Sequence, residues 1–192
     1  MSNNQSQMTG AYGEALVVTE LVKRGYVALN ANAAVRNHRA IDIVCIKYDD
    51  ATWAYKSVLI QVKTRRGRDF STGFNLSESI NIDLLNKEVK GPYVFIYLKD
   101  ENSPEYYILS RKQLIKLLSG LHIAYCKNIT GNSSRMNSEP ASLSLRFIQG
   151  ENGKKGTKLD GYINPFPGNI FHNAWDNTSI PQHYSLRSTF IY

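Results

Sequence analysis

The spacing of hydrophobic and polar positions divides much of this chain into helices and strands. A first helix is predicted over residues 10–24, with Thr9 as its N-cap and Gly25 as its stop. The apolar positions that recur at helical spacing within it are Ala11, Ala15, Val18, Leu21 and Val22. Residues 1–8 are polar and show no such period, so we expect a flexible N-terminus there.

Alternating or continuous apolar runs predict a series of short strands after this helix. The strand candidates are residues 26–29, 40–48, 53–64, 70–76, 93–99 and 106–109. Two further helices are predicted, one over residues 77–89 and one over residues 111–118, which Ser110 caps and Gly120 stops. This order of elements predicts an α/β fold in which helices flank a central mixed β-sheet.

The chain changes character beyond residue 120. Residues 121–192 include loop-like stretches rich in Gly, Lys and Pro, a strand candidate at 143–148 and several aromatic residues near the end. We expect an irregular, β-rich C-terminal extension that packs on a core formed by residues 9–120. Such an extension is a candidate for a specificity or dimerisation element.

The composition favours a globular protein with an anionic partner. The 192 residues are 42% hydrophobic and 20% charged, which is ordinary for one domain with an appendage. The net charge of +7 favours a polyanion such as nucleic acid, with a solvated basic surface as the alternative. We see no secretion signal and no apolar run long enough to span a bilayer, so a cytoplasmic location without membrane contact is expected.

Three polar residues stand on neighbouring strands of the predicted sheet. Residues two apart in a strand share a face, so Gln61 and Lys63 are expected on one side of it. Ile60 and Val62 then enter the core on the other side. Asp42 stands within an apolar run, where a carboxylate is costly to bury unless it is paired or holds a metal. A cross-strand ion pair between Asp42 and Lys63 is the alternative that the pattern leaves open.

The first helix contributes a fourth candidate. Glu14 borders the face that includes Val18 and Leu21, so we expect it to need a partner inside the fold. Glu20 contrasts with it, because Arg24 lies four residues on and can pair with it at the surface. Carboxylate and amide oxygens from these positions suit Mg²⁺, and a nearby lysine can orient a water or stabilise charge on a phosphate.

Taken together, these residues resemble the PD-(D/E)XK nuclease superfamily. The matching positions are Glu14, Leu21, Gly25, Tyr26, Ile41, Asp42 and the run Gln61-Val62-Lys63-Thr64-Arg65. The pattern is most similar to the archaeal Holliday-junction-resolvase-like, Mrr-like and intron-encoded homing endonuclease branches. The resemblance implies a restriction-endonuclease-like core and a Mg²⁺-dependent DNA endonuclease that hydrolyses phosphodiester bonds by a metal-activated water.

The resemblance also implies a role for each residue of the site. Asp42 would be the central metal ligand, Lys63 the catalytic lysine, and Glu14 a carboxylate that binds metal directly or through water. Gln61 and the backbone carbonyl of Val62 would complete the protein ligands of Mg²⁺, for which Mn²⁺ can substitute. Gln61 is a departure from the usual Asp or Glu, although some branches carry Gln here. Its amide oxygen can bind a cation but brings no negative charge, so weaker metal binding is expected.

Two basic clusters flank the strands that bear the site. They comprise Arg36, His38 and Arg39 before the first strand and Arg65, Arg66 and Arg68 after the second. Phosphate contact is predicted for both, with solvated basic loops as the alternative. DNA is therefore the expected partner, and a homodimer is left open by analogy with superfamily members that cut both strands. Two other functions stay open: an inactive nuclease-fold module for DNA binding or assembly, and a role with RNA or a protein partner.

Overall fold

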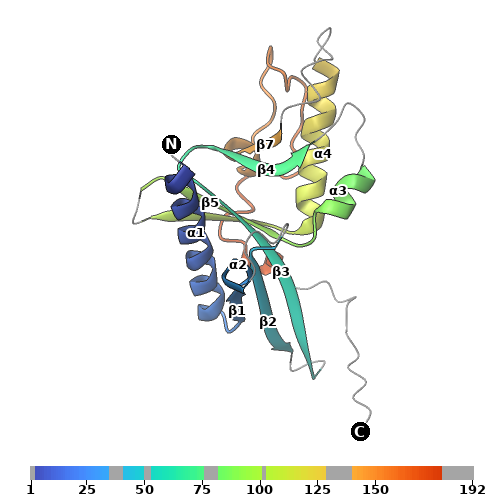
Figure 1. The fold of residues 1–192 in the computed structure, drawn as a ribbon. Coiled ribbons are helices and arrows are strands. Elements are labelled where there is room, and N and C mark those ends of the chain that lie inside the picture. The colour runs from blue at the N-terminus through green and yellow to red at the C-terminus, as the bar shows by residue number, and fades with distance from the viewer. Residues whose placement is uncertain are drawn as a thin grey trace.

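A five-stranded sheet in the order β1-β2-β3-β5-β6 forms the centre of the molecule (Figure 1). The computed structural model describes residues 3–34, 41–49, 53–75, 82–100, 103–128 and 140–178. The strands of the sheet are β1 (Val27–Asn30), β2 (Ile43–Asp49), β3 (Ala54–Arg65), β5 (Tyr93–Leu98) and β6 (Pro104–Leu109). β3 and β5 run parallel, whereas the other neighbouring pairs are antiparallel, so the sheet is mixed.

Helices cover both faces of this sheet (Figure 1). α1 (Asn3–Lys23) lies on one face, and α3 (Ile82–Glu88) and α4 (Arg111–Asn128) lie on the other. The apolar cluster beneath α1 includes Val17, Leu21, Ile43, Ile60, Val62, Val94, Ile96 and Ile108. The predicted α/β fold with a central mixed sheet flanked by helices is confirmed, and it is compatible with a restriction-endonuclease-like core.

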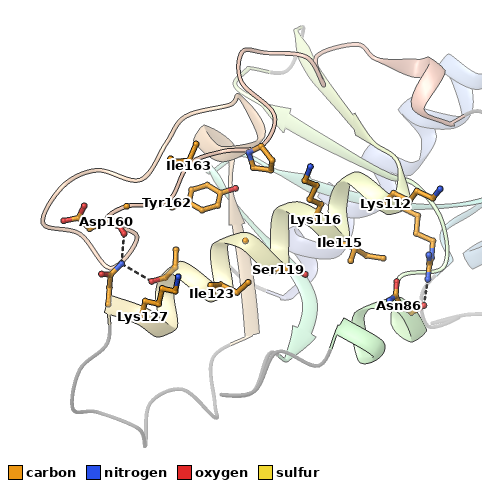
Figure 2. A pocket seen from close by; sticks show the side chains of 16 residues that line it. Asn86, Lys112, Ile115, Lys116, Ser119, Ile123, Lys127, Asp160, Tyr162 and Ile163 are labelled. Carbon is orange, nitrogen blue, oxygen red and sulfur yellow. Dashed lines mark hydrogen bonds between the residues drawn. The ribbon is translucent and has the colours of Figure 1, made fainter.

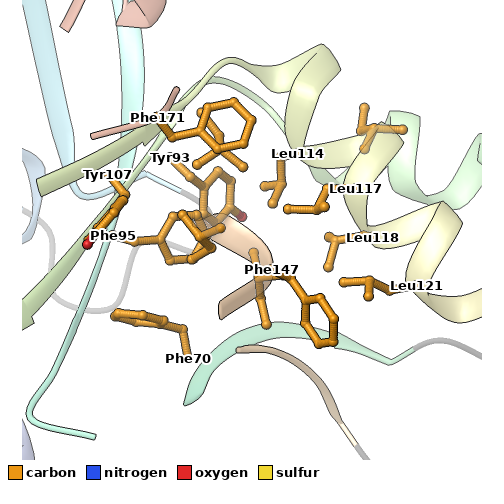
Figure 3. Packing of buried hydrophobic residues seen from close by; sticks show 14 of the residues in the cluster. Phe70, Tyr93, Phe95, Tyr107, Leu114, Leu117, Leu118, Leu121, Phe147 and Phe171 are labelled. Atoms are coloured by element: carbon orange, nitrogen blue, oxygen red, sulfur yellow. The ribbon is translucent and has the colours of Figure 1, made fainter. Parts of the chain in front are cut away.

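A second apolar cluster fills the space between the sheet and α4. Figure 3 shows the aromatic rings of the strands facing a row of leucines on that helix. The rings of Phe70 and Phe95 meet edge to face with their centroids 5.2 Å apart. Within β5, Phe95 enters this cluster while Val94 and Ile96 enter the one beneath α1. A strand buried on both faces needs a continuous apolar run, which explains why β5 shows no alternation in its sequence.

The first helix begins earlier than its apolar pattern indicates. α1 starts at Asn3, so the predicted start at residue 10 is wrong and residues 3–8 belong to the helix. Thr9 is not a cap, because its hydroxyl donates to the carbonyl of Gln5 within the helix at 2.9 Å. Residues 4–8 are exposed, so they carry no apolar period from which a helix can be predicted.

The buried face of α1 also differs from the predicted stripe. Val17 and Leu21 are completely buried, whereas Val22 is 55% exposed. Ala11 and Ala15 are exposed as well. The exposed residues Ala11, Ala15 and Val22 also recur at helical spacing, so the sequence shows two possible apolar faces. The sheet buries the face that includes Val17.

The helix predicted over residues 111–118 is longer than expected. α4 continues through Gly120 to Asn128, because Leu121 and Ala124 keep burying an apolar face on the core. Its predicted start is confirmed. The backbone N–H of Ser110 donates to Oε1 of Gln113 at 2.8 Å, and the N–H of Gln113 points back to the Ser110 hydroxyl at 3.4 Å.

A two-stranded sheet and irregular segments complete the described part of the chain. β4 (Asp69–Asn75) pairs with β7 (Pro140–Ser144), and the short helix α5 (Leu145–Ile148) follows, so the strand predicted at 143–148 ends at residue 144. The 3₁₀ helix η2 (Trp175–Thr178) lies against β6, where the side chain of Asn177 donates to the carbonyl of Ile108 at 2.7 Å. Among the described residues, no helix has the length and apolar character needed to cross a bilayer.

Candidate active site

The carboxylate of Asp42 is held where β2 and β3 meet. Asp42 immediately precedes β2, and its backbone N–H donates to the carbonyl of Ile60 at 3.0 Å. Its Oδ2 accepts the backbone N–H of Val62 at 2.8 Å and the Nε2 of Gln61 at 2.5 Å. Asp42 is 8% exposed. These hydrogen bonds therefore offset the cost of removing a carboxylate from water.

Glu14 of α1 reaches the same place through two asparagines. Its Oε2 accepts the Nδ2 of Asn30 at 2.7 Å, and its Oε1 accepts the Nδ2 of Asn32 at 3.0 Å. The Nδ2 of Asn32 also donates to Oδ1 of Asp42 at 3.1 Å. A single amide therefore bridges two carboxylates that are far apart in the sequence.

Asn30 and Asn32 are site residues that the sequence pattern did not predict, because no helix or strand was expected over their segment. Asn30 ends β1, and Asn32 lies in the short helix α2 (Ala31–Ala34). The Oδ1 of Asn30 accepts the N–H of Asn32 at 2.8 Å, and the carbonyl of Asp42 accepts the N–H of Ala31 at 2.8 Å. Two asparagines two residues apart at the end of a predicted strand could have indicated this site, because both amides can then face one carboxylate.

Lys63 lies two residues beyond Gln61 on the same face of β3 and is partly buried. Burial lowers the pKa of Lys63 below the usual range for lysine; the charge of Asp42 opposes this shift, Arg65 adds to it and Glu14 opposes it. No ion pair joins Lys63 to Asp42 among those that the described residues form. The carboxylate of Asp42 instead accepts hydrogen bonds from Gln61 and Val62, and Lys63 holds its proton more weakly than an exposed lysine does.

Close packing of α1 on β3 sets the position of Glu14. Gly13, the preceding residue, is buried against Thr64, and a Cβ on Gly13 would lie 2.7 Å from the Cβ of Thr64. Real Cβ atoms do not approach other atoms this closely, so glycine is required for α1 to lie at this depth. The apolar pattern of the helix did not reveal this role of Gly13.

The oxygen atoms of the site fit a hard divalent cation. Gln61 is 8% exposed, and its Oε1 has no hydrogen-bond partner within the described segments of the chain. A buried carbonyl oxygen without a partner, beside the carboxylates of Asp42 and Glu14, suits Mg²⁺, which prefers oxygen ligands. The described part of the chain gathers no group of three or more His, Cys, Asp or Glu side chains that could hold a metal. A cation here would therefore bind two carboxylates and an amide, while Val62 supplies its N–H to Asp42.

Three of the predicted phosphate-binding residues lie at one end of the strand that carries Lys63. Arg65 ends β3, and Arg66 and Arg68 follow in the turn before β4, all at exposed positions. The other three, Arg36, His38 and Arg39, lie outside the described residues. The exposed cations adjoin the site without entering the hydrogen bonds around Asp42.

Glu20 behaves as the contrast with Glu14 predicted. Its carboxylate pairs with Lys23 and Arg24 on the outer face of α1, and these two cations lower its pKa. Glu14 instead accepts hydrogen bonds from the amides of Asn30 and Asn32.

Part of the chain has a relative among known proteins. The chain is similar to UPF0102 protein CE1920 of Corynebacterium efficiens. The two are 37% identical over 76 residues, which is 40% of this chain and 54% of the relative. The chain thus spans about half the length of this curated relative, whose name assigns no activity. No family model and no solved structure matches the chain.

Proposed function

We propose that this chain is a Mg²⁺-dependent endonuclease that hydrolyses phosphodiester bonds in DNA. The observation that supports this most directly is the hydrogen-bonded path from Glu14 through Asn32 to Asp42, next to the unpartnered Oε1 of Gln61. Buried carboxylates beside an unpartnered carbonyl oxygen destabilise the free protein, and a bound cation would offset this cost by binding their oxygen atoms. The net charge of +7 favours a polyanionic substrate.

Each residue of the site has a role in this proposal. Asp42, Glu14 and the Oε1 of Gln61 would hold Mg²⁺, and Asn32 orients the two carboxylates. When bound, Mg²⁺ would supply Lewis-acid stabilisation of the charge that develops on the phosphate. Because burial lowers its pKa, Lys63 can accept a proton from the attacking water more readily than an exposed lysine can.

The reaction is hydrolysis at phosphorus. The oxygen of water forms a new bond to phosphorus, the bond to the leaving oxygen breaks, and that oxygen takes up a proton. In this scheme the neutral amine form of Lys63, which its lowered pKa makes more populated, receives the proton that water loses, and the leaving oxygen takes its proton from solvent. Arg65, Arg66 and Arg68 would contact neighbouring phosphates, which adds affinity without reading the base sequence.

Cleavage assays with single-site variants test the proposal. Supercoiled, linear duplex, single-stranded and branched DNA are incubated with the protein and Mg²⁺, Mn²⁺ or EDTA. Asp42→Asn and Lys63→Met are expected to slow cleavage by about 10²–10⁴-fold. Glu20→Gln is the matched control, because it alters a carboxylate on the same helix as Glu14 that lies outside the site. Cleavage of no substrate by the unaltered protein, or equal cleavage by the Asp42 and Lys63 variants, rejects the assignment.

A non-catalytic DNA-binding module is the second candidate, and the amide of Gln61 favours it. The Nε2 of Gln61 donates to Asp42, an arrangement that satisfies the carboxylate without any cation. This candidate predicts DNA binding that weakens steeply with salt and is unchanged by Lys63→Met. It also predicts no heat of Mg²⁺ binding in titration calorimetry, whereas the nuclease predicts binding that Asp42→Asn removes.

A further inference from the structure

The outer face of α4 forms one wall of a groove with a volume of about 820 Å³. The opposite wall is the segment of residues 160–165, and α3 closes one end through Asn86 (Figure 2). Among the described residues that line this groove, none belongs to the candidate active site.

The charges along the groove favour an anionic ligand. The basic residues that line it are Arg111, Lys112, Lys116 and Lys127, and the acidic one is Asp160. Figure 2 shows the lysines following the length of α4 beside the groove. Lys112, Lys116 and Lys127 are exposed, and their spacings of four and eleven residues keep them on one side of the helix. A ligand that carries several negative charges in a row fits this edge.

The floor of the groove combines apolar surface with two buried hydroxyl groups. Ile115 and Ile123 supply apolar surface, and Tyr162 and Ser119 also line the groove. The oxygen atoms of both hydroxyls are buried and have no hydrogen-bond partner among the residues that the structure describes, and Tyr162 is 5% exposed. Buried polar atoms of this kind are costly in the free protein, and a bound ligand with polar edges would satisfy them.

Glycine at position 120 allows Tyr162 to lie on α4. A Cβ on Gly120 would come within 3.1 Å of Cε2 of Tyr162. A side chain at this turn of α4, where the sequence alone predicted the helix to stop, would push the ring or the helix by a few tenths of an ångström.

We propose that this groove binds a single-stranded segment of nucleic acid. The phosphates lie along the lysine edge, and the bases lie on the apolar floor, where their polar edges meet the hydroxyls of Tyr162 and Ser119. Strand-binding grooves generally combine a cationic track with aromatic side chains on which bases stack, and Tyr162 is an aromatic residue of this lining. An acidic amphipathic helix would also match the lysines, but its apolar face would leave both hydroxyls without partners.

The groove extends the proposed nuclease function without sharing residues with it. Its end at Arg111 is tied to the segment before β5, because the Arg111 guanidinium donates to the carbonyls of Val89, at 2.7 Å, and of Asn86. Pro92, three residues after Val89, accepts the backbone N–H of Gln61 at 3.1 Å. A short stretch of chain therefore links the groove to the candidate active site.

Fluorescence anisotropy in EDTA tests the proposal apart from any cleavage. Labelled single-stranded DNA, single-stranded RNA, duplex DNA and an acidic amphipathic peptide are titrated with the full chain. We expect both single strands to bind more tightly than the duplex and the peptide. In Lys112→Gln/Lys116→Gln, the log–log slope of single-strand affinity against salt is expected to fall by about 1.4, since each phosphate contact on a single strand contributes roughly 0.7. Lys154→Gln/Lys155→Gln removes the same charge from exposed lysines outside the groove and is the control.

Tyr162→Phe separates binding from folding. This variant removes a hydroxyl for which the described part of the chain provides no partner, so its melting temperature is expected not to fall. Single-strand affinity is expected to drop by about threefold to tenfold. Equal losses in both lysine pairs, tighter binding of the peptide or duplex, or unchanged affinity in Tyr162→Phe overturns the proposal. Failure of the nuclease proposal would appear as absent cleavage with these binding results intact.

Discussion

The contact of Gly13 with Thr64 makes a sharp prediction, because it couples the depth of α1 to the position of Glu14. The change is Gly13→Ala. The added Cβ would lie 2.7 Å from the Cβ of Thr64, and ordinary contact begins at 3.4 Å, so helix and strand have to separate by about 0.7 Å. Rotation of the Thr64 side chain cannot relieve this, since the Cβ atom does not move with the rotamer.

Two opposing effects set the size of the change in stability. Alanine in a helix is favoured over glycine by up to about 1 kcal/mol. Overpacking of a tight contact costs about 1–3 kcal/mol. Gly10→Ala in the same helix is the matched control, because a Cβ on Gly10 meets nothing within 4 Å and gains the helical preference alone. The Gly13 variant is therefore expected to be about 1–3 kcal/mol less stable than the Gly10 variant, or about 2–4 °C lower in melting temperature for each kcal/mol.

Thermal unfolding and Mg²⁺-dependent cleavage, measured on both variants, test this reasoning. Displacement of α1 would move Glu14 away from Asn30 and Asn32, and misplacement of a catalytic group by about 1 Å can slow a reaction by about 10²-fold. Gly10→Ala leaves these contacts in place and is expected to keep full activity. If the two variants have equal melting temperatures and equal activity, α1 does not depend on this contact for its position.

Three further predictions concern individual side chains. Gln61→Glu replaces the amide that donates to Asp42 with a second negative charge, so the melting temperature of the variant in EDTA is expected to be lower than that of the natural chain. Mg²⁺ is expected to raise the melting temperature of the variant more than that of the natural chain. Equal responses to Mg²⁺ would contradict the role of Gln61 as a ligand. Lys63→Met is expected to unfold at higher urea than the natural chain near pH 7. Because burial lowers the folded-state pKa of Lys63, the unfolded chain binds more protons than the folded chain at pH values below the usual 10.5. The natural chain therefore gains stability as pH rises. The stability advantage of Lys63→Met over the natural chain is expected to shrink in urea titrations at higher pH. Burial raises the pKa of the Cys45 thiol to about 12, so alkylation followed by mass spectrometry is expected to modify Cys126 alone until the chain unfolds, and early labelling of Cys45 would contradict this.

Local pattern was sufficient for the elements that carry the site and for some of its residues. The hairpin of β5 and β6, the long strand β3 and the start of α4 all follow from short-range signals that survive in the structure. Alternation along β3 places Gln61 and Ile60 on opposite faces of the strand, because a strand has a period of two whatever it packs against. The surface pairing of Glu20 with Arg24 was equally predictable, since both groups lie on one turn of one helix.

Contacts between distant segments decided the rest. Two faces of α1 carry apolar residues at helical spacing. The sheet buries the face with Val17 and leaves Val22 exposed, and this outcome depends on which face packs against the strands. The bridge from Glu14 through Asn32 to Asp42 joins three separate elements, so no local spacing encodes it. The sequence by itself determined periodicity, charge and the residue types available for chemistry. Only the tertiary structure determined which of those residues meet, because burial and hydrogen bonding across the sheet depend on the positions of segments that lie far apart in the chain.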